Sequence, residues 1–509
     1  MQAMSKSNIF LTASALALIT SLAPVGAHAA ASQTANLQNE INDLQAQLNQ
    51  LKAQQTAAAA PVTTAPAAAD SSSTVVDKVS NFMNSDAPLT WSGITLYGTL
   101  DVGVSNQSHG TAYNANFPTS VGEMLQKNAS GAVWSVTPNG LEQSKIGLKG
   151  EEAVLKNSTY GDVNAVFKLE AGFNPVSGVL SNAQQSQINN NGNTVLARTS
   201  TNGDSSRDGQ VFEGAAYGGL SNKTFGTLTF GRQTTVLADD VVSYDPQGSS
   251  YAFSPIEWSG TVQGGGYTED ARYDDSLKYS VAYGPVRFAG IYQFAGNTNT
   301  YGGDDAYQGD IGVDYAGLSV DALLATKHDA VLTSTNSAAT AAAGNLNQLK
   351  ATVADTNTYG FFARYDFKDA GVEFLKPAKV FVGYEHIRYS NPNDPLSANA
   401  TSLGGFSYAA INSTAYSTNE KLNVVWGGVR YAFTPKLTVS AADYAYSQND
   451  YAGAGSGTQN YSSLVADYQL TKRIDAYAGL MYSRVFDGMA VGYIHNNNLS
   501  TDTGLRFKF

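Results

Sequence analysis

The chain has 509 residues, no cysteine and a formal net charge of −12 at pH 7. The lack of cysteine excludes disulfides, thiolate metal sites and cysteine nucleophiles. The acidic balance disfavours nucleic acid as a partner, because no basic stripe is present to neutralise phosphates. After the N-terminus, no apolar run is long enough to predict a transmembrane helix.

The first 29 residues have the pattern of a secretory signal peptide. Lys6 supplies a positive charge, residues 9–22 form a short apolar stretch, and Ala27-His28-Ala29 fits a small-x-small cleavage site. We therefore expect residues 1–29 to be removed and exclude them from the fold.

Residues 33–55 predict a short coiled coil. Apolar residues recur there at alternating spacings of four and three, the seam of a coiled coil, at Leu37, Ile41, Leu44, Leu48 and Leu51. Only about two heptads are present, so a polar, partly helical tether is the open alternative. Residues 56–90 are rich in Ala, Pro, Thr and Ser and predict a flexible linker.

From residue 91 to residue 509 the apolar pattern changes to a period of two, as in strands with one face towards lipid and one towards water. Tyr359, Phe361 and Ala363, for example, alternate with polar residues such as Arg364. Segments 379–389 and 436–446 alternate less cleanly, and their faces stay unassigned. The pattern predicts sixteen strands, at 92–104, 142–153, 160–173, 210–220, 225–233, 272–284, 285–296, 306–315, 317–328, 356–367, 377–390, 421–433, 436–448, 459–470, 473–485 and 500–509.

The connections between these strands alternate in length. The short ones carry turn residues, such as Gly284-Pro285 and Ala316-Gly317. The long ones are rich in Gly, Asn, Ser and Thr and are expected around 105–141, 174–209, 234–271, 329–355 and 391–420. Tight turns on one rim and long loops on the other are typical of outer-membrane barrels, and a soluble β-sandwich gives no reason for this alternation.

The last strand ends on an aromatic residue. Leu505, Phe507 and Phe509 share one face, and Arg506 and Lys508 share the other. This ending resembles the C-terminal signal by which outer-membrane barrels are recognised for assembly.

Several segments resemble the Gram-negative trimeric porins, especially the β-proteobacterial type. They are ITLYGTLD (94–101), SKIGLKGEE (144–152), FKLEAGF (167–173), LTFGRQ (228–233) and GLRFKF (504–509). The resemblance implies an all-β fold, a 16-stranded antiparallel transmembrane β-barrel, here preceded by the short coiled-coil helix. It also implies assembly into trimers and a third long loop folded into the lumen.

The chain departs from this family in two places. The simplest porins lack the heptad segment, although some specific channels place a coiled coil before the barrel. The third loop lacks the family's usual proline-acid-aromatic-glycine tip, and its nearest counterpart is SPIEW (254–258). The constriction is therefore the part of the family pattern that carries over least.

Strand alternation predicts a basic lumen wall that faces an acidic third loop. The expected wall residues are Lys145, Lys149, Lys168, Arg272, Lys278, Arg287, Arg364, Arg430 and Arg506, and the expected loop acids are Asp239, Asp240, Asp245 and Glu257. Such an arrangement creates a transverse field that sieves dipolar solutes. Ordinary solvated charges on a polar lumen are the alternative. Arg232 shares the face of Leu228 and Phe230, so it lines the pore only if a bulge intervenes.

The sequence predicts no enzyme, no cofactor and no metal site. The histidines after the signal peptide are scattered without ligand spacing. Asp304, Asp305 and Asp310 offer calcium-type ligands, but an acidic external loop accounts for them.

We therefore expect an outer-membrane porin for passive diffusion of small hydrophilic solutes and ions, a homotrimer surrounded by outer-membrane lipid, with no nucleic-acid partner. The solute and ion preference stays open. The alternatives are a substrate-selective channel, or a barrel anchor whose periplasmic coiled coil contacts a partner or the cell wall.

Overall fold

The structure is a computed structural model that describes residues 80–109, 131–156, 159–176, 214–256, 271–294, 305–334, 350–369, 371–397, 410–451, 455–490 and 495–509, with a few isolated positions between them. The chain divides into two compact units, 1–74 and 75–509, and the fold below is that of the second. The predicted signal peptide and coiled coil lie outside the described residues, as does most of the predicted linker.

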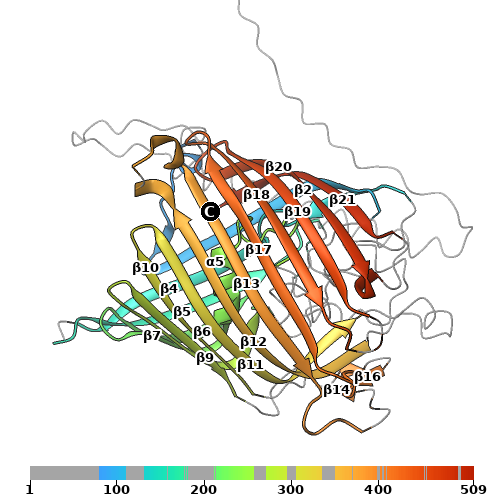
Figure 1. Cartoon of the computed structure of the whole chain (residues 1–509). Coiled ribbons are helices and arrows are strands. Elements are labelled where there is room, and N and C mark those ends of the chain that lie inside the picture. The colour runs from blue at the N-terminus through green and yellow to red at the C-terminus, as the bar shows by residue number, and fades with distance from the viewer. Residues whose placement is uncertain are drawn as a thin grey trace, which may run out of the picture. The chain divides into compact units, whose positions relative to one another are not determined.

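Sixteen long antiparallel strands form a closed β-barrel, as predicted (Figure 1). They are β2 (Ile94–Gln107), β4 (Lys145–Leu155), β5 (Val163–Gly172), β6 (Ala215–Asn222), β7 (Gly226–Thr234), β8 (Arg272–Tyr283), β9 (Val286–Gln293), β10 (Ala306–Tyr315), β11 (Leu318–Ser334), β12 (Lys350–Asp366), β13 (Ala378–Ser390), β17 (Glu420–Ala432), β18 (Leu437–Gln448), β19 (Gly457–Gln469), β20 (Ile474–Asp487) and β21 (Asn497–Lys508).

The first and last long strands close the barrel. β2 pairs with β21, with Leu100 opposite Phe507. Gly98 and the terminal Phe509 exchange two backbone hydrogen bonds, each of 3.0 Å. Closure pairs each of the sixteen long strands with two neighbours, so that no long strand presents a free edge to lipid.

Shorter elements lie in the connections. They are β1 (Leu89–Trp91), β3 (Val133–Pro138), α5 (Val236–Tyr244), β14 (Ser402–Leu403), β15 (Phe406–Ser407), β16 (Ala410–Asn412) and three 3₁₀ turns at Phe367–Asp369, Glu373–Leu375 and Gly488–Ala490. No helix among the described residues is long and apolar enough to cross a membrane.

Neighbouring side chains of a strand have opposite environments. In β12, Phe361 is 56% exposed on the outer face, whereas Phe362 is 2% exposed on the inner face. Large apolar side chains recur on the outer face around the barrel, including Leu324, Val382 and Leu464. This outer face suits the hydrocarbon of a bilayer.

The inner wall from β12 to β20 carries large buried aromatic residues, such as Trp426, Tyr444 and Tyr477. In β13, the buried Phe381 and Ile387 lie on the inner face although both are apolar. The segment 379–389 alternates poorly in sequence because apolar and charged residues lie on both faces of β13, with Glu385 buried and Arg388 exposed. In 436–446, the inner face mixes Ser440 with Tyr444, and the outer face carries Asp443.

The predicted bounds of the loop at 329–355 are wrong at both ends. Strand β11 continues to Ser334, and β12 begins at Lys350. The two strands pair from Ala330–Ala354 to Ser334–Lys350 beyond an irregularity in register. Ala and Thr dominate these extensions, so no alternation of apolar and polar residues marks them as strand.

The described chain begins at the rim of the short turns. Arg473, in the turn between β19 and β20, donates from Nε to Phe82 O at 2.8 Å and from Nη2 to Ala87 O at 2.7 Å. Its guanidinium also lies 4.2 Å from the centre of the Phe82 ring. Residues 80–87 are therefore attached to this rim before β1 begins.

Candidate functional site

The third long connection, between β7 and β8, begins with helix α5. Thr235 caps the helix, with its Oγ1 accepting from Ala238 N at 3.1 Å. Leu237 N donates to the Gln308 side chain on β10 at 2.9 Å. Val236 and Val241 are buried with Leu237. An apolar face on the helix, set against the inner wall, therefore holds the start of this connection inside the barrel (Figure 1).

Side chains of β12 and β17 bind the carbonyl oxygens at the C-terminal end of α5. Arg364 donates to Ser243 O at 3.2 Å, Trp426 Nε1 donates to Tyr244 O at 3.0 Å, and Arg430 Nη2 donates to Pro246 O at 2.8 Å. The last carbonyls of a helix have no partner within the helix and carry partial negative charge. The two arginines and the tryptophan N–H of the wall supply the missing hydrogen bonds, and the arginines also balance the partial negative charge.

Asp245 fixes the turn that follows the helix. It accepts from Tyr444 Oη at 2.5 Å, from Ser249 N at 2.6 Å and from Gln247 N at 3.2 Å. Gln247 in turn donates to Ser463 Oγ on β19 at 2.9 Å. Burial raises the pKa of Asp245, and the hydrogen bonds from Tyr444 and Ser249 oppose that rise.

The connection then reaches β20. Ala252 N donates to Gly140 O at 2.9 Å, and the ring of Phe253 meets the edge of Tyr477 at 6.2 Å. A Cβ at Gly479 would lie 2.7 Å from the Phe253 ring, so this close approach requires glycine. The described part of the third loop therefore contacts the inner wall from β9 to β20 and narrows the lumen.

Most of the predicted basic wall residues have polar partners close by. Lys145 pairs with Glu142 at 2.8 Å, and Lys168 pairs with Glu170 at 3.1 Å. The ammonium group of Lys149 lies 5.5 Å from the centre of the Tyr97 ring. The other contacts are Arg272 Nε to Gly214 O, Lys278 with Asp239, Arg287 with Asp314 and Asp321, and Arg506 with Asp467 and Asp475.

The predicted loop acids lie in different environments. Asp239 is half-exposed and pairs with Lys278, whereas Asp245 is 1% exposed and faces hydrogen-bond donors of the loop and wall. Asp240 is buried against the wall. Burial, followed by the nearby carboxylates of Asp310 and Asp321, raises the pKa of Asp240 to about 9. Glu257 lies outside the described residues.

Arg232 stays on the face of Phe230. The pairing of β7 with β8 contains a bulge next to Arg232. The extra residue belongs to β8, because Asp274 and Asp275 together lie opposite the single residue Arg232. The alternation of β7 is therefore undisturbed. Arg232 forms an ion pair of 2.5 Å with Asp274.

Sequence reasoning missed the acids of the inner wall. Asp310 lies in β10 and is 6% exposed, so the explanation of this residue as part of an acidic external loop is wrong. Asp321 lies in β11 and is 3% exposed. The signal was available, since Asp310 shares a face with Gln308, and Asp321 shares one with Ser319.

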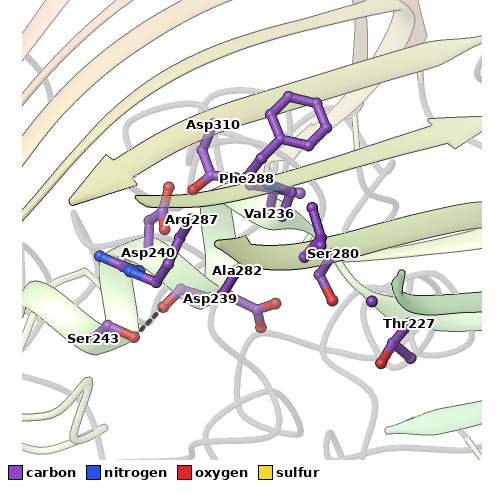
Figure 2. A pocket seen from close by; sticks show the side chains of 13 residues that line it. Thr227, Val236, Asp239, Asp240, Ser243, Ser280, Ala282, Arg287, Phe288 and Asp310 are labelled. Atoms are coloured by element: carbon purple, nitrogen blue, oxygen red, sulfur yellow. Dashed lines mark hydrogen bonds between the residues drawn. The ribbon is translucent and has the colours of Figure 1, made fainter. Parts of the chain in front are cut away.

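A cavity of about 410 Å³ adjoins these acids (Figure 2). It lies between α5 and the strands β8 and β9, and Asp239, Asp240, Arg287 and Asp310 are among its lining residues. Figure 2 shows Asp240 and Asp310 turned towards each other, with the carboxylate of Asp239 pointing elsewhere.

Comparisons with known proteins agree on one family. The sequence model described as Gram-negative porin matches residues 56–487. An outer membrane porin protein of Bordetella pertussis is 28% identical over 190 residues, which are 37% of this chain and 39% of that protein. The chain thus matches well under half the length of this curated relative.

Solved structures show the same fold. The anion-selective porin from Comamonas acidovorans is 16% identical with a TM-score of 0.53, and the match covers 82% of this chain and 99% of that one. A loop-deletion mutant of the outer membrane protein OmpT of Vibrio cholerae is 15% identical with a TM-score of 0.50, again over 82% and 99%.

Proposed function

The chain belongs to the Gram-negative porin family, and from that membership we propose that it forms a water-filled channel for passive diffusion of small hydrophilic solutes and ions. It is accordingly a multi-pass β-barrel of the Gram-negative outer membrane. The observation that carries the proposal is the third connection, which is bound to the inner wall from β9 to β20. A loop held there limits the size of the solutes that pass.

The charges beside the loop support a field across the narrowed lumen. Arg364 and Arg430 bind neutral carbonyl oxygens, so these partners do not cancel their charge. Asp239 lies on the helix with half of its side chain exposed, and its ion pair with Lys278 offsets part of its charge. Separated charges of opposite sign in a narrow aqueous gap orient water and dipolar solutes. The predicted wall cations and Asp239 are therefore our proposed pore lining, and Asp245 is a proposed anchor of the loop.

We propose a homotrimer and no catalytic function. The trimer rests on family membership. The proposal of no catalysis rests on the neighbours of the described histidines: His109 stacks on His495 with ring centres 4.0 Å apart, and His386 contacts Asn423 at 2.8 Å. His328 pairs with Asp305 at 2.7 Å. Cross-linking followed by mass measurement of the detergent-extracted protein tests the trimer, and a protomer mass alone would contradict it.

A liposome-swelling assay tests the channel. Proteoliposomes are diluted into iso-osmotic solutions of sugars of increasing size, with protein-free liposomes as the control. We expect swelling rates that fall with sugar size, because the fixed loop sets the limit. Swelling no faster than in the control, from correctly folded protein, would contradict the proposal.

A second role, tethering, is favoured by the contacts of Arg473 with Phe82 and Ala87. In barrels of this class the short turns face the periplasm, so residues 80–87 lie on the periplasmic rim. The predicted coiled coil at 33–55 could then contact the cell wall or a periplasmic partner. Co-sedimentation with purified peptidoglycan tests this role: the full chain should sediment, and a chain lacking residues 31–75 should not.

A further inference from the structure

Three buried carboxylates meet where the third loop lies against the wall. They are Asp240 on α5, Asp310 on β10 and Asp321 on β11. One oxygen of each lies within 4.8 Å of the others. Two oxygens bound to the same calcium ion, each at about 2.3–2.6 Å, can be up to roughly 5 Å apart. The spacing therefore allows all three groups to bind one ion.

Two oxygens of this cluster have no hydrogen-bond partner among the described residues. Asp321 uses Oδ2 to accept from Tyr244 and from Arg287 Nη2 at 3.0 Å, and Asp310 uses Oδ1 to accept from Ala289 N at 2.7 Å. Asp240 Oδ2 and Asp321 Oδ1 are buried and unpartnered. Buried carboxylate oxygens without a partner are unfavourable, which points to a group that the protein itself does not supply.

The charge of the cluster is also unbalanced. Arg287 pairs with Asp321 at 3.0 Å, and its single positive charge is set against three carboxylate groups. Arg287 also pairs with Asp314, with Arg287 Nε 2.7 Å from Asp314 Oδ2. Excess negative charge on hard oxygen ligands is the environment that divalent cations such as calcium prefer.

The adjoining cavity gives the cluster room for water. Asp240, Asp310 and Arg287 line this space of about 410 Å³ (Figure 2). Calcium takes six to eight oxygens, so water from the cavity would complete a shell that the protein fills in part.

We propose that Asp240, Asp310 and Asp321 bind a divalent cation of the calcium type, which joins helix α5 of the third loop to strands β10 and β11. The ion would balance the excess charge and give both unpartnered oxygens a ligand. Its binding does not depend on what the lumen transports, so the site can be tested apart from the proposed function.

The test is calcium binding to the whole purified chain in detergent, after removal of divalent ions with EDTA. Equilibrium dialysis with radioactive calcium gives the number of ions bound per protomer. Asp240→Asn removes one ligand charge, and Asp310→Asn is a second variant whose amide oxygen can still accept from Ala289 N. Asp239→Asn is the matched control, because it removes the same charge one residue along the helix.

We expect both ligand variants to bind one ion fewer per protomer than the wild type and Asp239→Asn. Added calcium should also raise the Tm of the wild type and of Asp239→Asn, but not that of Asp240→Asn. The heat-dependent shift of the folded barrel on gels verifies folding of each variant. Equal ion numbers in all four proteins would overturn the proposal. A Tm that calcium leaves unchanged in the wild type would overturn it too, and would indicate that the carboxylates share a proton instead.

Discussion

Replacement of Asp245 by asparagine tests whether buried polar contacts hold the third loop against the wall. Asp245 Oδ2 accepts the backbone N–H of Ser249 at 2.6 Å. The asparagine carbonyl can still accept from Tyr444 and Gln247, but its NH₂ group would face the Ser249 N–H. Loss of a hydrogen bond to a buried carboxylate, with a buried donor left unpaired, should destabilise the closed loop by about 2–3 kcal/mol.

Hydrogen–deuterium exchange measures this opening peptide by peptide. A change of this size predicts exchange roughly 30- to 150-fold faster in the described part of the loop, with protection of the barrel strands unchanged. The control is Asp239→Asn, which removes the same charge from the same loop at a half-exposed side chain, where the asparagine oxygen can still accept from the Lys278 ammonium group. Equal exchange in the two variants would refute the anchoring role of Asp245.

Three further predictions concern the lumen and the N-terminus. Arg430→Met removes the cation that binds Pro246 O, so the reversal potential in a salt gradient should shift towards cation preference; an unchanged potential would place Arg430 outside the ion path. Gly479→Val puts a Cβ 2.7 Å from the Phe253 ring, which should displace the loop and change single-channel conductance. Conductance equal to that of the wild type would show that the loop does not contact β20 at this position. Deletion of residues 31–75 should leave conductance and oligomeric state unchanged, and loss of either would show that the N-terminal segment is needed for the channel.

The barrel was predictable because its signals are local. Alternation locates each of the sixteen strands, and turn chemistry marks the short rim, as at Ala316-Gly317, where both residues have positive φ. Strand ends were mispredicted, or faces left unassigned, where apolar and polar residues do not alternate. The extensions of β11 and β12 mix small, polar and apolar residues without alternation, as in Ala330-Val331-Leu332, and β13 has apolar and charged residues on both faces.

The lumen was less predictable because its contacts join distant segments. Asp240 was singled out as a loop acid, but nothing in the sequence brings it to Asp310 and Asp321, which the strand register and the fold of the loop place beside it. Asp245 was likewise singled out for its charge, whereas its burial follows from Tyr444 on a strand 199 residues away. The predicted coiled coil at 33–55 and Glu257 lie outside the described residues and stay predictions.

The most direct test of a diffusion channel is single-channel conductance of the purified protein in a planar bilayer, with a salt gradient across it. A water-filled trimeric channel predicts long-lived open levels whose current rises in proportion to salt, with closure in three equal steps under high voltage. Small currents that saturate with salt would point to a substrate-selective channel instead. The absence of conductance from a correctly folded barrel would contradict the account.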